Sequence, residues 1–203
     1  MQTQTHAKSQ LATAAAVVTH AVESYDTWKR AFDTHATARR DAGIIAVHVN
    51  RHAEDPNLLS VYLGGTDAAK LAGFLSSTDL AATMRGAGVK GPPHVVTVTP
   101  VEDLTVKDRP LAGAILRHEV SDYAAWKRAF DGHADARSRA GIIGHAVNRS
   151  EKNPNVVVVY LQAESHEPLR AFASAPDVKQ VMQAAGVIGA PDITFVNGGT
   201  WES

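Results

Sequence analysis

The chain has 203 residues, of which 44% are hydrophobic and 20% charged, so it can form a hydrophobic core and is not a disordered tail. Its 20 Lys and Arg balance 21 Asp and Glu, and this net charge of −1 gives no basic surface for nucleic acid or an anionic membrane. The absence of cysteine excludes disulfides, thiolate nucleophiles, zinc–thiolate sites and iron–sulfur clusters.

The N-terminal segment is polar over residues 1–10, which indicates a disordered arm, and it becomes apolar over residues 11–18. The apolar stretch follows Lys8 and has some features of a weak secretory signal. No turn separates it from residues 19–22, however, so we predict a β-strand and a cytoplasmic protein. No apolar run approaches the ~20 residues that a membrane-spanning helix needs, so no membrane association is expected.

An internal duplication organises the rest of the chain. At an offset of 98 residues, the register holds without a gap from Val17 to Thr97, with about 35 identities in roughly 80 positions. Residues 25–39 against 123–137 form the longest similar stretch. The predicted organisation is a disordered arm at 1–14, a first domain at 15–99, a charged linker at 100–112 and a second copy of the domain at 113–203.

Each copy is predicted to fold as a βαββαβ unit. A short strand at 17–22 precedes a helix that begins at Ser24 and runs to about Ala42, where Gly43 ends it. Trp28, Phe32, His35 and Arg39 follow one another along a single face of that helix. The remaining elements of the first copy are strands at 44–51 and 58–63, a second helix through Leu71 and Phe74, and a strand at 95–99, and the second copy repeats them up to a strand at 193–196.

One strand indicates how the two copies pack. Residues 156–161 of the second copy read Val-Val-Val-Val-Tyr-Leu, so this strand is apolar on both faces and must be covered on both. Helices cover only one face of a lone βαββαβ sheet. The other face therefore needs a second sheet, which the other copy can supply.

With Trp28-Lys-x-x-Phe-Asp-x-His35 on the first helix and Ala87-Gly-Val-x-Gly-x-Pro93 near the end of the copy, the chain resembles the dimeric α/β-barrel superfamily. Within it, the resemblance is to the antibiotic-biosynthesis-monooxygenase-like proteins. It implies an α+β fold, in which two ferredoxin-like repeats pack their antiparallel sheets face to face as an α/β barrel within one chain. It also implies a cleft between the sheet and the helices of each unit.

Two histidines of each copy are predicted to meet across that layer. The helix begins near Tyr25, so His35 lies about 15 Å along it at about 1.5 Å per residue. His20 lies about 16 Å back along the preceding strand at about 3.3 Å per residue. The two imidazoles therefore reach the same height if the strand face that carries His20 looks at the helix. His118 and His133 repeat this arrangement in the second copy.

Such a pair of imidazoles can act as general acid and base near neutral pH. It can also hold a metal together with Asp33, although two histidines alone are too few ligands. The structural alternative is that each is a core histidine bonded to the backbone. Only two of the first copy's five aligned histidines recur in the second, which matches the overall identity and does not single them out.

The other candidate substrate-binding side chains are weaker. A tryptophan beside a histidine suits stacking on a planar substrate, although core packing is the commoner role. The arginines can bind a carboxylate or be solvated, and solvation is favoured. His48 and His145 occupy neighbouring strand positions of opposite facing. These candidates form three recurring pairs: Trp28 and Trp126, Tyr25 and Tyr123, and Arg39 and Arg137.

Nucleotide-binding loops, a serine nucleophile elbow and His-Glu-x-x-His are all absent from the sequence. The resemblance implies a small-molecule enzyme of the cofactor-independent monooxygenase, cyclase or isomerase type, acting on a polyketide-like or aromatic substrate. Two alternatives stay open: a non-catalytic ligand-binding or stress-related barrel, and a protein that binds haem or a metal through helix histidines. The expected partner is a small molecule, and a homodimer of the fused barrel also stays open.

Overall fold

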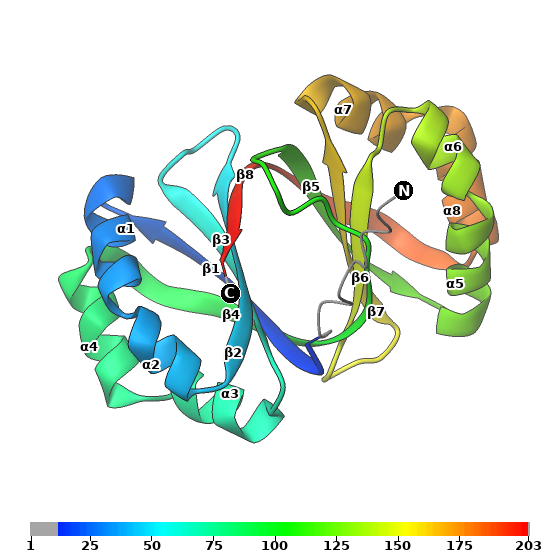
Figure 1. Cartoon of the computed structure of the whole chain (residues 1–203). Coiled ribbons are helices and arrows are strands. Elements are labelled where there is room, and N and C mark those ends of the chain that lie inside the picture. Colours follow the sequence, from blue (N-terminus) through cyan, green and yellow to red (C-terminus); the bar gives the residue numbers. More distant parts are fainter. Residues whose placement is uncertain (1–11, 203) are drawn as a thin grey trace, which may run out of the picture.

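The computed structural model describes residues 12–202 and contains two successive βαββαβ units (Figure 1). The first consists of β1 (Ala14–Val22), α1 (Tyr25–Thr34), α2 (Ala36–Asp41), β2 (Ile44–His52), β3 (Leu58–Gly65), α3 (Ala68–Leu75), α4 (Thr78–Gly86) and β4 (Val89–Asp103). The second consists of β5 (Ala112–Val120), α5 (Tyr123–Gly132), α6 (Ala134–Arg139), β6 (Gly144–Ser150), β7 (Val156–Ala163), α7 (His166–Ser174), α8 (Pro176–Ala184) and β8 (Val187–Glu202). The predicted α+β fold is confirmed.

The strands form one closed antiparallel barrel in the order β1-β3-β2-β8-β5-β7-β6-β4. Figure 1 shows the helices of each unit on the outer face of its own sheet, with the barrel interior between the two sheets. The sequence predicted that the sheets would face each other. The structure adds that their edges are hydrogen-bonded, because β2 pairs with β8 and β4 pairs with β6.

Both faces of β7 are buried, as the sequence predicted for this strand. Every residue from Val156 to Ala163 is buried. Alternate side chains point to opposite faces of a strand. Val157, Val159 and Leu161 accordingly pack against the helices of the second copy, whereas Val158 joins Ala15 and Val98 of the first copy inside the barrel.

The helix predicted to run to Ala42 is divided at His35 into α1 and α2, and the same break recurs at His133. In the first copy, the Thr34 hydroxyl donates to the carbonyl of Arg30 at 2.6 Å, a local bond that competes with the helical ladder and bends helices. The second copy has Gly132 at the equivalent position, and glycine is a poor helix former. The expectation of one continuous helix was therefore wrong.

The last strand of each copy is much longer than predicted, because each continues past its own sheet to pair with the other copy. β4 extends to Asp103, so residues 100–103, assigned to the linker, form strand. Pro100 lies at a register shift, where a strand tolerates a missing N–H. Of the disordered arm predicted for residues 1–14, residues 1–11 lie outside the described part, and Ala14 already belongs to β1. None of the helices in residues 12–202 is long and apolar enough to cross a membrane.

Candidate functional site

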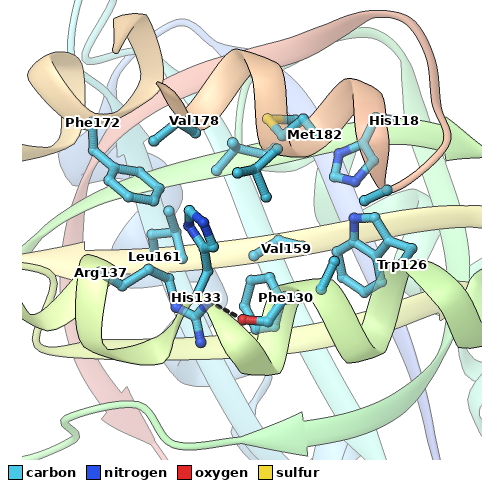
Figure 2. Close-up of a pocket in the computed structure, with 14 residues that line it drawn as sticks. His118, Trp126, Phe130, His133, Arg137, Val159, Leu161, Phe172, Val178 and Met182 are labelled. Carbon is cyan, nitrogen blue, oxygen red and sulfur yellow. Dashed lines mark hydrogen bonds between the residues drawn. The ribbon is translucent and has the colours of Figure 1, made fainter. Parts of the chain in front are cut away.

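Each copy has a small cavity between the outer face of its sheet and its helices. The cavity of the first copy measures about 60 Å³ and that of the second about 70 Å³. In the first copy, β1 and β3 form the floor, and side chains of α1, α3 and α4 close the cavity from above. Figure 2 shows the second cavity, with His133 and Phe130 on one side and Val178 and Met182 of α8 on the other.

The linings of the two cavities are more similar than the copies as a whole. Ten of the fourteen residues around the first cavity are identical 98 positions later, well above the overall identity of the copies. A third cavity, of about 40 Å³, lies inside the barrel and takes residues from both copies. Of the six pairs of equivalent positions that line it, only Asn50/Asn148 and Tyr62/Tyr160 are identical. Because both regions are buried, burial alone does not account for this difference.

His20 on β1 and His118 on β5 lie at the floors of the two outer cavities, on the strand faces that look at the helices. Each residue is 6% exposed, and neither nitrogen of either ring has a hydrogen-bond partner among residues 12–202. The ring of His20 lies 5.6 Å from that of Trp28, and His118 lies 5.5 Å from Trp126. Burial lowers the pKa of both imidazoles to about 4, so both are neutral at pH 7.

His35 and His133 lie at the helix breaks and line the same two cavities. His35 Nε2 is 2.7 Å from the Asp79 carboxylate at the start of α4. Asp177 is the equivalent residue of the second copy, but it forms no hydrogen bond with His133 in the described chain. His20 and His35 therefore share a cavity without bonding to each other, since neither nitrogen of His20 has a partner in the described part of the chain. Asp33, the suggested additional metal ligand, instead pairs with Lys29.

Of the aromatic residues predicted to bind substrate, the tryptophans line the cavities and the tyrosines do not. Trp28 is 4% exposed and stacks on Phe32 at 4.8 Å between ring centres, so it forms part of the cavity wall. Tyr25 and Tyr123 do not belong to either cavity lining. The guanidinium of Arg51 lies 4.0 Å above the ring of Tyr25, and an arginine covers Tyr123 in the same way.

Arg39 and Arg137 line the cavities but are each only 5% exposed, so the expectation that they are solvated was wrong. Each guanidinium lies 3.7 Å above a phenylalanine ring, that of Phe32 or Phe130, and donates to the carbonyl of that same residue. Burial lowers the pKa of Arg39, and the negative charge of Glu202 opposes that shift.

The opposite facing expected for His48 and His145 is present. His48 lies inside the barrel, stacked on Trp201 at 4.4 Å. His145 lies on the helix side, with its ring 5.3 Å from that of Phe130. The two histidines therefore belong to different environments, and His145 packs against Phe130, which lines the second outer cavity.

Three residues at the first site were not identified from the sequence, which are Asp79, Met84 and Glu202. Asp79 and Met84 each had a signal, because the same residue stands 98 positions later at Asp177 and Met182. Glu202 had none. Its contact with Arg39 depends on the pairing of β8 with β2, which the pattern of a single copy does not contain.

No family model matches this chain, and neither does any curated protein. Solved structures do match. A candidate monooxygenase from Fusobacterium nucleatum superimposes with a TM-score of 0.66 at 10% identity, over 96% of both chains. An anthrone oxidase-like protein gives 0.65 at 11% identity, over 94% of this chain and 92% of the other. A ferredoxin-fold protein from Listeria monocytogenes, related to antibiotic biosynthesis monooxygenases, gives 0.54 at 9% identity, over 92% and 94%.

These matches concern the fold. Because nearly the whole of each chain is covered, the likeness extends to both βαββαβ units and not to one alone. The chain therefore shares the ferredoxin-like α/β-barrel fold of the monooxygenase-like proteins, as its sequence led us to expect.

Proposed function

We propose that each copy forms a small-molecule pocket of a cofactor-independent oxygenase, cyclase or isomerase that acts on an aromatic or polyketide-like compound. One observation supports this most strongly. In both copies a buried, neutral histidine, His20 or His118, faces a cavity, and no described residue forms a hydrogen bond with either ring nitrogen. The retained cavity linings agree with such a role in both halves of the chain.

A bound ligand would supply the hydrogen bonds that these buried imidazoles lack. Leaving one buried polar group without a hydrogen bond costs about 1–3 kcal/mol, and native proteins contain few such groups. A neutral imidazole offers one N–H donor and one lone-pair acceptor. A hydroxyl or enol group in the cavity can satisfy it, while Trp28 or Trp126 contacts the apolar ring of the ligand.

The second histidine suits proton transfer. Asp79 at 2.7 Å can orient the ring of His35 and stabilise its protonated form, as a carboxylate does in general acid–base pairs. His35 would remove an acidic O–H or C–H proton of the substrate. The resulting anion then reacts with dioxygen in an oxygenase, or takes the proton back at another atom in an isomerase. The proposed reaction uses no cofactor.

Cavity size limits which ligands fit. Benzene binds in a cavity of about 150 Å³. That volume is more than twice the volume of either pocket. An aromatic ring therefore requires Met84 or Met182 to move aside, and the unbranched methionine side chain adapts readily. Ligand pockets commonly measure roughly 300–1,000 Å³, so these small cavities favour the cofactor-independent proposal over the haem alternative. The small volume also favours a second candidate function, a ligand-binding protein without catalysis.

The test compares phenol with benzene. The signals of the indole N–H groups of Trp28 and Trp126 report each pocket separately during a titration. We expect phenol to bind about fivefold more tightly than benzene, because its hydroxyl bonds the imidazole, and to lose that advantage in His20→Phe at the first pocket only. Equal phenol and benzene affinities in the wild-type protein would contradict a ligand-facing role for His20.

Catalysis needs its own measurement. The doubly substituted variant His35→Gln/His133→Gln should still bind phenol but lose oxygen uptake with a one-ring dihydroxybenzene, the ring size that each pocket takes once its methionine moves. Unchanged oxygen uptake in this variant would exclude proton transfer by these histidines. Phenol binding without oxygen uptake in the wild-type protein would favour the ligand-binding candidate.

A further inference from the structure

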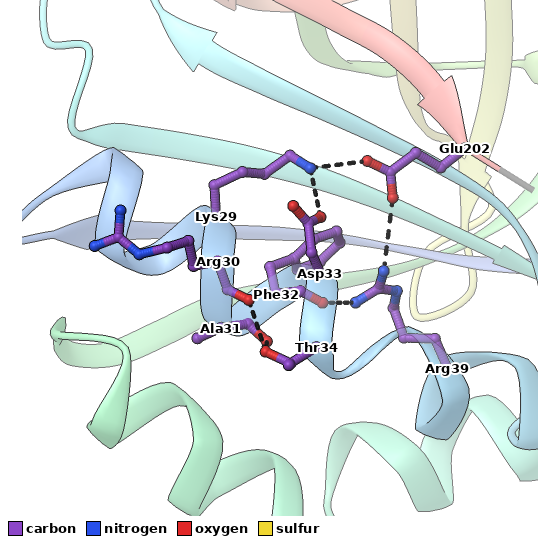
Figure 3. Close-up of polar contacts among 8 residues, drawn as sticks. All are labelled: Lys29, Arg30, Ala31, Phe32, Asp33, Thr34, Arg39 and Glu202. Atoms are coloured by element: carbon purple, nitrogen blue, oxygen red, sulfur yellow. Dashed lines mark hydrogen bonds and ion pairs between the residues drawn. The ribbon is translucent and has the colours of Figure 1, made fainter.

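A carboxylate from the last strand of the second copy contacts an arginine that lines the pocket of the first copy. Figure 3 shows Glu202 of β8 between Lys29 of α1 and Arg39 of α2. Its two oxygens lie 3.2 Å from the Lys29 ammonium and 3.6 Å from the Arg39 guanidinium. β8 reaches this place because it pairs with β2, where Glu202 lies opposite Val47.

Arg39 is the part of the pocket wall that depends on this carboxylate. Its guanidinium is buried above the ring of Phe32, and both residues line the cavity. A buried cation needs a negative partner, since burial without one is costly. Among the described residues, Glu202 is the carboxylate that forms an ion pair with Arg39, whereas Asp33 pairs with Lys29 and acts on Arg39 only through its charge.

The second copy has a related arrangement, in which a carboxylate from the first copy contacts the equivalent lysine but, among the described residues, forms no ion pair with Arg137. Glu102 on β4 lies 2.9 Å from the Lys127 ammonium and 3.5 Å from His145 Nε2. Burial lowers the pKa of Arg137, and the negative charges of Asp131 and, to a smaller extent, Glu102 oppose that shift. The residue 98 positions after Glu102 is Thr200, not Glu202, so the two glutamates do not correspond in the duplication. Two non-equivalent acids thus meet equivalent lysines, Lys29 and Lys127.

We propose that the two pockets are completed crosswise: Glu202 positions the Arg39–Phe32 wall of the first pocket, and Glu102 positions Phe130 of the second through His145, whose ring lies 5.3 Å from that of Phe130. Neither copy therefore contains all the residues that shape its own pocket. This inference rests on the proposed function only in taking the two cavities as ligand sites. Both glutamates are positioning residues, because Glu202 acts on its cavity through Arg39 and Glu102 acts through His145.

The test uses the full chain with Glu202→Gln and Glu102→Gln, which remove one charge each and keep the side-chain shape. Glu164→Gln is the matched control, because Glu164 pairs with Arg109 on the surface, away from both cavities. Phenol binding is followed at the Trp28 and Trp126 indole signals, assigned with phenylalanine variants. We expect Glu202→Gln to weaken binding about two- to fivefold at Trp28 only, and Glu102→Gln to do so at Trp126 only. The control should change neither.

A second readout needs no ligand. The Nε–H signal of Arg39, assigned with Arg39→Lys, should shift in Glu202→Gln and stay in place in Glu102→Gln. An unmoved Arg39 signal in Glu202→Gln, or equal effects of one substitution on both pockets, would overturn crosswise completion. A wild-type protein that binds phenol at neither indole would contradict the proposed function, and the Arg39 signal would still decide the present inference.

Discussion

Acid should destabilise the fold through its buried histidines. His20 and His118 have pKa values of about 4 in the folded chain, whereas an unfolded histidine titrates near 6.5. The unfolded state therefore binds more protons as the pH falls below about 6.5, and folding becomes less favourable until the pH reaches about 4. Between pH 7 and pH 5, each of these histidines should cost the folded state about 2 kcal/mol.

Replacing one of them isolates its contribution. In His20→Phe the ring persists without a titratable nitrogen, so the loss of unfolding free energy between pH 7 and pH 5 should shrink by about 2 kcal/mol. Urea unfolding followed by circular dichroism at both pH values gives this difference. His94→Gln, which removes an exposed histidine from β4, is the control. If His20→Phe loses as much stability on acidification as the wild-type protein, then His20 is not a buried neutral group and the reasoning fails.

Two further predictions concern packing. Alanine at Gly113 would place its Cβ 2.5 Å from the ring of Tyr160, so thermal unfolding should show a free energy of unfolding lower by about 2 kcal/mol or more. Gly73 in α3 is the control, because an alanine Cβ there meets nothing within 4 Å and should raise the free energy of unfolding by up to about 1 kcal/mol. A Gly113→Ala variant as stable as the wild-type protein would show that Tyr160 can move freely. Met84→Ala should enlarge the first cavity and raise the phenol affinity of that pocket severalfold, as read at Trp28, without changing the affinity read at Trp126. Unchanged phenol affinity in both pockets would mean that Met84 does not limit the entry of an aromatic ring.

Patterns within one copy were sufficient for most of the fold. The repeat and the doubly apolar β7 predicted two units with facing sheets, because a strand without a polar face must be covered twice. The break at His35 was missed because helical periodicity continues across it, and only the hydroxyl bond of Thr34 marks it. The ends of β4 and β8 were missed because their partners belong to the other copy.

The candidate site follows the same division. His20, Trp28 and His35 were found because strand and helix geometry fix their heights within one unit. Whether Arg39 is solvated depends on Phe32 beneath it and on Glu202, which is distant in sequence. Local pattern assigns a side chain to a face of an element, whereas its burial and its ionic partner depend on how the elements assemble.

The seams between β2 and β8 and between β4 and β6 have a consequence for biosynthesis. The first half of the polypeptide leaves the ribosome before the strands that pair with its outer edges have been made. Exposed strand edges are templates for association with other chains. The nascent protein is therefore vulnerable to aggregation until its own second half has been synthesised and covers these edges by strand pairing, which protects the first half without a separate chaperone.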